Sequence, residues 1–457
     1  MKTDPRTPMR TIEGEVRKNN FEVFLLGYTQ EEAQKEAARC YKCRKPLCRQ
    51  GCPIENRIPE FMKEVEDGNF AKAYEILMDK TCMPAICGTV CPHEDQCEGS
   101  CVHGKKGQPI AIGSVERFVA EWAEQNGLCD KVKPESNGHK VACVGAGPAS
   151  MACAQKLGEK GYELTVFEKQ NYKGGVLGWG IPSYRLGAPV VQNAFRHLDE
   201  LGVKFELDSP VSNVAELKDK GYEAVFLGIG ACLSNAMNIP GEDLKGVYAS
   251  NDYLTQINLD EIHEDGRRHF NGIGGTHVLV VGGGNVAMDA ARDSIRLAQN
   301  ETTTIVYRRS EQEMPAATEE LNHAKEEGVV FQTLTNPVAF IGDENGYVKQ
   351  AECAIMKLGE PDASGRRRPI ESDEPHLFID VDTVVLALGF SNDPDISAHT
   401  EGLDADKWGC FLVDDDQKTS LPYVFAGGDA VTGAQTVVKA MKAGMKAAVS
   451  IDEYFNK

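Results

Sequence analysis

Nine of the fifteen cysteines of this 457-residue chain lie in one stretch near the N-terminus. Such density in a long chain is unlike a disulfide scaffold, which is normally a short secreted domain. Thiolates are the usual ligands of zinc and of iron–sulfur clusters. The stretch therefore predicts metal or iron–sulfur chemistry. The nine are Cys40, Cys43, Cys48, Cys52, Cys82, Cys87, Cys91, Cys97 and Cys101.

The spacing of these cysteines favours iron over zinc. The first four read C-x2-C-x4-C-x3-C and end on Pro53, and Cys91 is also followed by a proline. A run that starts with CxxC and ends with Cys-Pro is typical of two-cluster ferredoxins, whose last cysteine ligates the other cluster. Zinc sites prefer paired CxxC or CxxC with HxxxH, and structural zinc stays the alternative.

A dinucleotide-binding pattern lies at residues 140–169. An apolar run leads into a glycine turn, a helical stretch follows, and a second apolar run ends on an acid. Such glycines let backbone N–H groups approach a pyrophosphate, and an acid about 20 residues later can bind a ribose diol. A turn that only packs a helix on a sheet is the alternative. The predicted site residues are Gly145, Gly147, Pro148, Ala149 and Glu168.

The pattern recurs at residues 275–309, but there the second strand ends on two arginines, Arg308 and Arg309. A carboxylate at that place would repel a 2′-phosphate, whereas guanidiniums pair with it. We therefore predict an FAD adenosine at the first turn and NADP(H) at the second. A solvated strand end is the other interpretation of the arginines. The second turn contributes Gly283, Gly284, Asn285 and Val286.

The elements that must position these residues can be predicted in outline. Residues 29–32 resemble a capping box that opens a helix running into the first cysteines. Amphipathic helices are expected at 58–66 and 70–79, and a helix with one apolar face near 114–125. Residues 1–28 read as an extended arm with little packing signal.

Composition excludes several classes of function. The net charge of −20 argues against a nucleic-acid or anionic-membrane partner. No apolar run approaches the roughly 20 residues that span a bilayer, and the polar N-terminus does not resemble a signal peptide. We expect a cytoplasmic protein of two or three domains.

Downstream, the chain resembles the two-dinucleotide-binding-domain flavoproteins. A buried strand at 382–389 and a second one ending on Gly427-Gly428-Asp429 precede a helical stretch at 435–454. By this likeness Gly428 and Asp429 bind FAD, and Gln435 and Thr436 open a helix that faces the flavin. No CxxC follows residue 139, so direct electron transfer from the flavin to a disulfide is disfavoured.

The chain as a whole resembles the small (β) subunit family of NADPH-dependent glutamate synthase. Relatives of that family include the N-terminal half of dihydropyrimidine dehydrogenase and the large subunit of an electron-bifurcating ferredoxin:NADP oxidoreductase. The likeness rests on ARCYKCRKPLCRQGCP, AICGTVCPHEDQCEGSCV, GGVLGWGIPSYRL, VVGGGNVAMDAAR, YRRSEQEMPA and VFAGGDAVTGAQTVVKAMKAG. It implies an α/β protein: an N-terminal α-helical two-cluster [4Fe–4S] domain, then an FAD domain with an inserted NADP domain. The expected ranges are 1–135 (iron–sulfur), 140–265 and 375–457 (FAD) and 270–374 (NADP).

Carried over by position, the resemblance implies two sets of cluster ligands. One cluster would use Cys40, Cys43, Cys48 and Cys101; the other Cys52, Cys91, Cys97 and Glu116. Glu116 also reads as a carboxylate in a first helical turn, and Cys87 is the alternative fourth ligand. The segment 174–186 and a Gly-Ile-Gly turn would line the flavin. Their expected FAD residues are Gly175, Leu177, Arg185 and Gly230.

The resemblance implies that NADPH delivers hydride to FAD and that single electrons leave through the clusters. The partner would be an amidotransferase-type glutamate synthase large subunit. In the transhydrogenase alternative it would be a smaller FAD/[2Fe–2S] subunit with ferredoxin. An NADPH-sensing scaffold with structural metal is the non-enzyme alternative.

Overall fold

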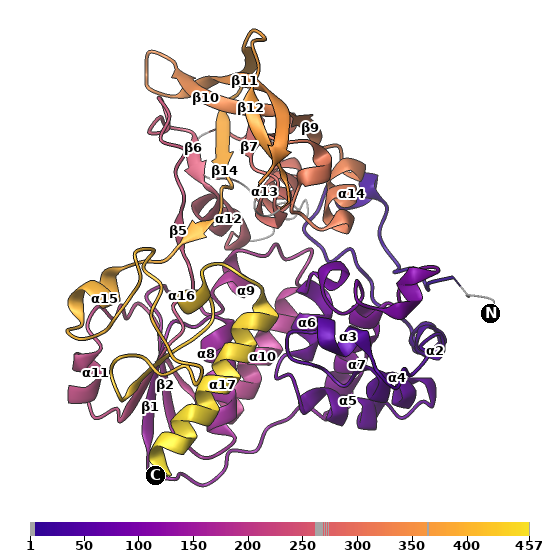
Figure 1. Ribbon diagram of the computed structural model, residues 1–457, viewed down its shortest axis with the longest axis vertical. Helices are drawn as coiled ribbons and strands as arrows, with labels where there is room; N and C mark the ends of the chain where they lie inside the picture. Colours follow the sequence, from indigo (N-terminus) through magenta and orange to yellow (C-terminus); the bar gives the residue numbers. More distant parts are fainter. Residues whose placement is uncertain are drawn as a thin grey trace.

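The computed structural model describes residues 5–260, 268, 270, 272, 274–362 and 365–456. The described chain forms three parts: a helical part, a lower sheet domain and an upper sheet domain (Figure 1). Residues 261–267 lie outside the described residues; they include the end of the expected FAD range 140–265. No described helix is long and apolar enough to cross a membrane.

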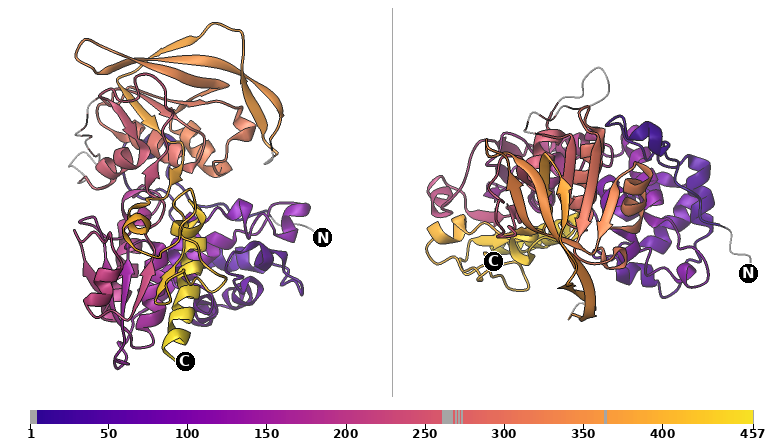
Figure 2. Two further views of the ribbon diagram at one scale, coloured as in Figure 1. Left: turned by 60° about the vertical axis from the view of Figure 1, so that its left-hand side comes forward. Right: turned by 90° about the horizontal axis from the view of Figure 1, so that it is seen from above.

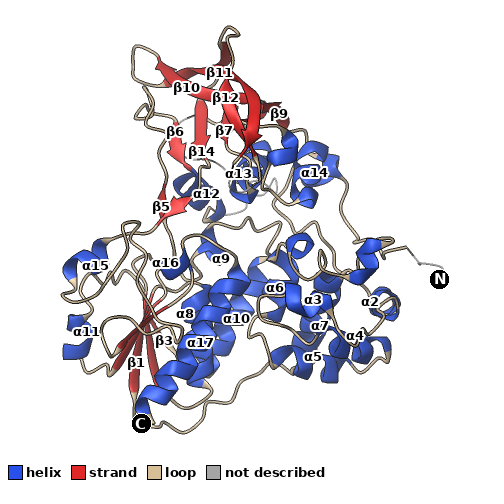
Figure 3. Cartoon of the chain, viewed as in Figure 1, coloured by secondary structure: helices blue, strands red, loops and turns tan. Residues whose placement is uncertain are grey.

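The N-terminal part is built from helices and loops, as Figure 3 shows by colour. Its capping box is confirmed, because Thr29 Oγ1 accepts from the Glu32 N–H while the Glu32 carboxylate accepts from the Thr29 N–H. Phe61, Phe70 and Val115 contribute to one buried core among these helices. The helices are α1 (Gly14–Arg17), α2 (Gln30–Ala38), α3 (Leu47–Gly51), α4 (Ile58–Glu66), α5 (Phe70–Met78), α6 (Pro84–Val90), η1 (His93–Asp95), η2 (Val102–Lys105) and α7 (Ile112–Gln125).

The lower domain contains a parallel sheet of order β16-β4-β1-β2-β3. The edge strand β16 comes from the C-terminal part of the chain, as expected for a domain with an insertion. Helices α8 and α17 pack so closely that a Cβ added to Gly444 would lie 2.0 Å from the Ala149 carbonyl oxygen. The strands are β1 (Lys140–Val144), β2 (Glu163–Phe167), β3 (Lys204–Glu206), β4 (Ala224–Leu227) and β16 (Val424–Ala426). The helices are α8 (Pro148–Gly158), α9 (Val176–Trp179), α10 (Ala188–Glu200), α11 (Ala215–Asp219), α15 (Asp395–His399), α16 (Asp429–Thr432) and α17 (Val437–Phe455).

The upper domain holds a second parallel sheet, of order β6-β14-β7-β8-β9. The expected FAD ranges had assigned both β6 and β14 to the lower domain, and this was wrong. Both strands are too short to reveal their partners, and each pairs only through contacts distant in sequence. The elements are β6 (Val247–Ala249), α12 (Ser250–Asn258), β7 (His277–Val281), α13 (Asn285–Arg296), β8 (Thr302–Tyr307), η3 (Glu311–Glu313), α14 (Thr318–Glu326), β9 (Val330–Thr333) and β14 (Thr383–Leu386).

Two smaller sheets complete the fold. An antiparallel sheet, which the sequence analysis did not predict, covers the far end of the upper domain (Figure 2). A two-stranded pair joins the two chain crossings between the sheet domains. The strands are β10 (Thr335–Gly342), β11 (Val348–Pro361), β12 (Arg367–Glu371) and β13 (Leu377–Asp380), and the crossing pair is β5 (Leu233–Ser234) with β15 (Phe390–Ser391).

The N-terminal arm packs more firmly than the sequence indicated. Phe21 and Phe24 are 1% and 0% exposed and belong to the core of the upper domain. At its other end Arg6 forms an ion pair of 2.6 Å with Glu98 of the cysteine-rich part. The arm therefore connects the helical part to the upper domain. The burial of its two aromatic rings holds the arm in one position.

Candidate functional site

The structure brings the first predicted cysteine set together. Cys40, Cys43, Cys48 and Cys101 line one small cavity, and all four are partly exposed. Burial raises the pKa of Cys48 to about 12, and the neighbouring Cys101 and Cys40 add to that rise. Four thiols on one cavity, with no carboxylate lining it, form a soft donor set that fits an iron–sulfur cluster.

The second set gathers between α6 and α7. Burial raises the pKa of Cys97, and Glu116 and Cys52 lie close enough to raise it further. The neighbouring Cys87 thiol raises the pKa of Cys91, and burial and Glu116 raise it further. The structure thus brings Cys52, Cys91, Cys97 and Glu116 into one group, and also places Cys87 there.

Glu116 is a buried carboxylate without a hydrogen-bond partner for Oε1 among the described residues. Burial raises its pKa to about 8. The close approach of α6 and α7 explains its position: a Cβ added to Gly88 would lie 2.6 Å from the Arg117 backbone nitrogen. A buried, unpartnered carboxylate costs free energy unless something pairs with it, so the group fits a metal-bound ligand.

The first glycine turn has the predicted form. Gly147 is the N-cap of α8, and the Glu168 carboxylate accepts a hydrogen bond of 2.8 Å from the Ala146 N–H. The acid that ends β2 therefore lies at the turn. A Cβ added to Gly147 would meet no atom within 4 Å. A Cβ added to Gly175 would lie 3.1 Å from the Gly147 Cα, so the two segments are in contact. The two glycine segments form one surface.

The C-terminal Gly-Gly-Asp segment joins the same surface. Gly428 has φ +71° and approaches α8, where its added Cβ would be 3.0 Å from Ala149 Cβ. Asp429 Oδ1 and Thr436 Oγ1 are buried without hydrogen-bond partners among the described residues. Burial raises the pKa of Asp429 to about 6, although the Gln435 N–H opposes this. Orphaned polar atoms beside a glycine turn fit a polar cofactor such as FAD. Leu177 lies buried nearby in α9, and Gly230 has φ +72° with no atom within 4 Å of an added Cβ.

The second glycine turn opens on α13, with Gly284 as its N-cap. Asn285 Oδ1 accepts a hydrogen bond of 2.8 Å from the Ala317 N–H, which ties the turn to α14, and Val286 is partly buried. The two arginines differ. Arg309 is buried and donates to the Arg367 carbonyl (2.7 Å) and to Asp362 (3.0 Å). Arg308 is exposed, and within the described chain its side chain makes no ion pair or hydrogen bond.

One cavity lies between the second cysteine set and the second glycine turn. A space of about 1000 Å³ between the helical part and the upper domain is lined by Cys91, by Asn285 and by Arg185. Glu94 of the cysteine-rich part also accepts a hydrogen bond of 2.6 Å from the Thr318 N–H at the start of α14. The helix that follows the second glycine turn and the second cysteine set therefore face a common space.

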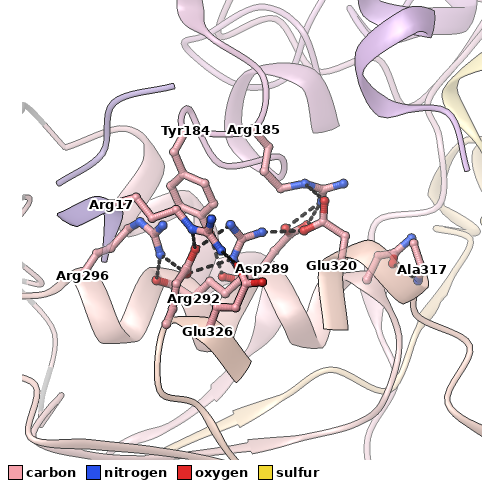
Figure 4. Close-up of polar contacts among 11 residues, drawn as sticks. Arg17, Tyr184, Arg185, Asp289, Arg292, Arg296, Ala317, Glu320 and Glu326 are labelled. Atoms are coloured by element: carbon pink, nitrogen blue, oxygen red, sulfur yellow. Dashed lines mark hydrogen bonds and ion pairs between the residues drawn. The ribbon is translucent and has the colours of Figure 1, made fainter. Parts of the chain in front are cut away.

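Arg185, expected to contact FAD, instead makes an inter-domain contact. Its guanidinium binds both oxygens of Asp289 (2.7 and 2.8 Å) and Glu320 at 3.0 Å, so it links the α9–α10 segment to the upper domain. Figure 4 shows the wider network, in which Arg17 of the arm, Arg292 and Arg296 also gather. This network was not predicted from the sequence. The available signal was the i, i+3, i+4, i+7 spacing of Asp289, Arg292, Asp293 and Arg296 on α13.

Two family models match successive parts of the chain. Residues 17–128 match the family described as dihydropyrimidine dehydrogenase domain II, 4Fe–4S cluster, and residues 139–444 match pyridine nucleotide-disulphide oxidoreductase. The small chain of NADPH glutamate synthase from Escherichia coli is 34% identical over 98% of this chain and 95% of its own length. The β subunit of NADP(+)-dependent formate dehydrogenase from Moorella thermoacetica is 36% identical, over 90% of this chain. The β subunit of NADPH–Fe(3+) oxidoreductase from Geobacter sulfurreducens is 35% identical, also over 90%. This chain spans 60% and 64% of the lengths of the last two relatives.

Solved structures share the fold of the sheet domains. FprA from Mycobacterium tuberculosis in complex with NADPH has a TM-score of 0.57 at 19% identity, over 70% of this chain and 84% of that one. Thioredoxin reductase from T. acidophilum has a TM-score of 0.50 at 20% identity, over 69% and 97%. Fold and site define an NADPH-dependent flavin and iron–sulfur oxidoreductase. The chain belongs to the glutamate synthase small-subunit family, with a 4Fe–4S domain ahead of a pyridine nucleotide-disulphide oxidoreductase unit.

Proposed function

We propose that this chain is an electron-transfer subunit that oxidises NADPH and reduces a partner protein. FAD would lie on the first nucleotide fold and two [4Fe–4S] clusters on the helical part. The observation that carries the proposal is the shared cavity, because Cys91 and Asn285 line the same space of about 1000 Å³. When bound, FAD accepts hydride and releases electrons singly, and the clusters carry one electron at a time.

The residues of the chain bind and orient these groups. Helix α8 would direct its N-terminal N–H groups at the FAD pyrophosphate, and Glu168 would accept hydrogen bonds from the ribose. The unpartnered oxygens of Asp429 and Thr436 would bind polar atoms of the cofactor. The proposed FAD residues are Gly145, Gly147, Pro148, Ala149, Glu168, Gly175, Leu177, Gly230, Gly428, Asp429, Gln435 and Thr436. Arg185 would act by positioning, since its guanidinium binds Asp289 and Glu320.

The cluster ligands are proposed as two sets. Cys40, Cys43, Cys48 and Cys101 would hold the first cluster, and the common cavity supports that set. Cys52, Cys91, Cys97 and Glu116 would hold the second, because Glu116 is buried and its Oε1 has no partner among the described residues; Cys87 is the alternative fourth ligand. None of these cysteines is paired in a disulfide, because all fifteen cysteines are free thiols in the structure. Their sulfur atoms are therefore available as ligands.

Anaerobic titration with NADPH tests the proposal. The purified protein should contain FAD and iron, and its flavin absorbance should bleach on addition of NADPH, followed by reduction of the iron–sulfur absorbance. Protein that carries zinc in place of iron, or whose flavin NADPH does not bleach, would support an NADPH-binding scaffold and overturn the proposal.

NADP(H) is proposed to bind at Gly283, Gly284, Asn285 and Val286, with its 2′-phosphate on Arg308 and on the adjacent Arg309. Arg308 is the stronger candidate because its side chain is exposed and unpaired within the described residues, whereas Arg309 already binds Asp362. A charged hydrogen bond contributes about 1.5–3 kcal/mol. We expect Arg308→Ala to raise KM for NADPH about 10- to 100-fold, while KM for NADH changes less than about twofold.

Steady-state kinetics with both nucleotides checks this expectation. Arg308→Lys is the matched variant: it keeps the charge but loses the bidentate geometry, so its KM for NADPH should fall between wild type and Arg308→Ala. An equal rise of KM for NADPH and NADH would assign Arg308 a structural role, and no rise would remove it from the phosphate site.

The partner is proposed to be a redox subunit. The relatives from Escherichia coli, Moorella thermoacetica and Geobacter sulfurreducens are named as chains or subunits of larger enzymes. Anaerobic co-purification would identify the partner: a much larger amidotransferase-type chain supports glutamate synthesis, and a smaller flavin subunit supports transhydrogenation.

A further inference from the structure

The antiparallel sheet meets the second nucleotide fold at the point where strand β8 ends. Leu334, which follows β9, donates a backbone hydrogen bond of 3.0 Å to the Arg309 carbonyl, and the Met356 N–H of β11 donates one of 2.7 Å to the Leu334 carbonyl. Where β11 ends, the Asp362 N–H donates to the Arg366 carbonyl at 2.7 Å, and the chain turns into β12. The hairpin formed by β11 and β12 is therefore fastened beside the residues that bind the 2′-phosphate in the proposed function.

Arg309 is the residue that this hairpin contacts. Its Nε donates a hydrogen bond of 2.7 Å to the Arg367 carbonyl, and its Nη2 lies 3.0 Å from the Asp362 carboxylate. The side chain of Arg309 is 8% exposed and that of Asp362 is 24% exposed, so the carboxylate lies on the solvent side of the pair. One guanidinium therefore has two different partners, a neutral backbone oxygen and a charged carboxylate.

The position of Arg309 does not depend on the charge of Asp362. The bond from Arg309 Nε to the Arg367 carbonyl and the bond from the Leu334 N–H to the Arg309 carbonyl both involve backbone oxygens, and Asp362→Asn removes neither. This substitution can also keep the turn, because Asp362 Oδ1 accepts from the Arg366 N–H at 3.3 Å and an amide oxygen accepts in the same way. The charge of Asp362 can therefore be removed while the guanidinium stays in place.

The charge of Asp362 opposes a phosphate ligand. A carboxylate on a guanidinium takes up donors that a phosphate needs, and it repels a 2′-phosphate. Arg308 provides the contrast, because its side chain is exposed and within the described chain makes no ion pair or hydrogen bond. The nearby acid Glu313 is itself compensated, since Arg367 Nε lies 2.7 Å from its carboxylate. Of these two acids, Asp362 is the one that contacts a proposed phosphate ligand.

We propose that Asp362 is a specificity-determining residue of the NADP(H) site, because its carboxylate competes with the 2′-phosphate of NADPH for the Arg309 guanidinium. This inference rests on the proposed function, which places the 2′-phosphate on Arg308 and Arg309. A phosphate carries more negative charge and more acceptor oxygens than a carboxylate, so it displaces Asp362 when NADPH binds. The lost ion pair lowers the affinity for NADPH, whereas NADH has no 2′-phosphate and leaves the pair intact. Asp362 thereby reduces the preference of the chain for NADPH over NADH.

Calorimetric titration of the anaerobically purified holoprotein with adenosine 2′,5′-bisphosphate tests this inference without any electron transfer. We expect Asp362→Asn to bind adenosine 2′,5′-bisphosphate about three- to tenfold more tightly than wild type, because the Arg309 guanidinium is no longer compensated. The affinity for 5′-AMP, which lacks the 2′-phosphate, should change less than about twofold. Glu311→Gln is the matched control: it removes one negative charge close to Arg309 in sequence, from a carboxylate that pairs with Lys325 at 2.6 Å. It should leave both affinities within about twofold of wild type.

A double variant tests whether Asp362 acts through Arg309. Arg309→Ala should weaken the binding of adenosine 2′,5′-bisphosphate, and in that background Asp362→Asn should tighten it by a smaller factor than in the wild-type background, since the coupling requires both partners. Melting temperatures measured in parallel show whether each variant is folded. Asp362→Ser, whose hydroxyl oxygen can also accept from the Arg366 N–H, replaces Asp362→Asn if the latter is unfolded.

The outcomes are distinguishable. Tighter binding of adenosine 2′,5′-bisphosphate to Asp362→Asn, with unchanged 5′-AMP binding and a smaller effect in the Arg309→Ala background, supports the inference. Weaker or unchanged binding would make Asp362 only an anchor of the hairpin, and equal tightening by Glu311→Gln would assign the effect to net charge; either result overturns the inference. The proposed NADP(H) site fails in a different way: Arg308→Ala and Arg309→Ala would then both bind adenosine 2′,5′-bisphosphate as tightly as wild type.

Discussion

Glu327→Gln is expected to destabilise the upper domain by about 3–5 kcal/mol, the range measured when one partner of a buried ion pair is removed. Glu327 is 1% exposed and accepts from three arginines: Arg17 at 2.7 Å, Arg292 at 2.9 and 3.0 Å, and Arg296 at 2.6 Å. Glutamine keeps the shape but removes the charge, which leaves buried guanidiniums without compensation. The loss corresponds to roughly 10 °C in the melting temperature of a domain of this size.

Glu326→Gln is the matched control. Glu326 also binds Arg17, at 2.7 Å, but its side chain is 57% exposed, and exposed pairs contribute about 0–1 kcal/mol. Melting of the holoprotein, followed by fluorescence and by limited proteolysis of the arm, measures both variants. Similar melting temperatures for Glu327→Gln and wild type would show that the network contributes no net stability.

The pH dependence gives the same network a second readout. Burial alone would raise the pKa of Glu327, but hydrogen bonds and charges from Arg296 and Arg292 outweigh burial and hold the pKa well below its ordinary value. A depressed carboxyl pKa stabilises the fold above the unfolded value, about 4.3, and the contribution is lost as pH falls toward the folded value. The difference between wild type and Glu327→Gln should therefore be constant around neutral pH and shrink below about pH 4.

The parts of the fold that the sequence predicted are those with local signals. Both strand–turn–helix units could be identified because the glycine turn, the helix and the following strand are contiguous, and Glu168 lies where its spacing placed it. The capping box at Thr29 is likewise a four-residue signal. Periodicity and capping depend on near neighbours, so a single sequence is sufficient for them.

What the sequence did not predict depends on contacts distant along the chain. Phe21 and Phe24 read as part of a loose arm, because the core that buries them is formed by residues of the upper domain. Arg185 lies in a glycine-rich segment typical of a flavin site, yet its two carboxylate partners come from α13 and α14. The charges of α13 become a buried ion network through partners from the arm, from α14 and from the segment that carries Arg185, and all of these are distant along the chain.

Glu116→Ala is expected to remove one proposed cluster and thereby uncouple the flavin from the partner. Iron should fall from about eight to about four atoms per chain if each cluster holds four. NADPH should still bleach the flavin, since Glu116 is on α7 and none of the proposed nucleotide residues is. Reduction of a protein acceptor should fall about 100-fold or more, because loss of a ligand should exceed the roughly 10- to 100-fold cost of losing an outer-shell partner. Iron analysis, stopped-flow absorbance and acceptor reduction measure the three quantities.

Cys87→Ala discriminates between the two candidate fourth ligands. Cys87 is 1% exposed and its thiol lies beside Cys91, so it could replace Glu116 in the second set. Loss of iron in Cys87→Ala but not in Glu116→Ala would reverse the assignment. Stability gives an independent readout: if Glu116 is only a buried, unpartnered carboxylate, its removal relieves a desolvation cost and should raise the melting temperature while iron stays intact. If it is a ligand, its removal should lower the melting temperature together with the iron content, because a metal bound only to the folded state stabilises that state.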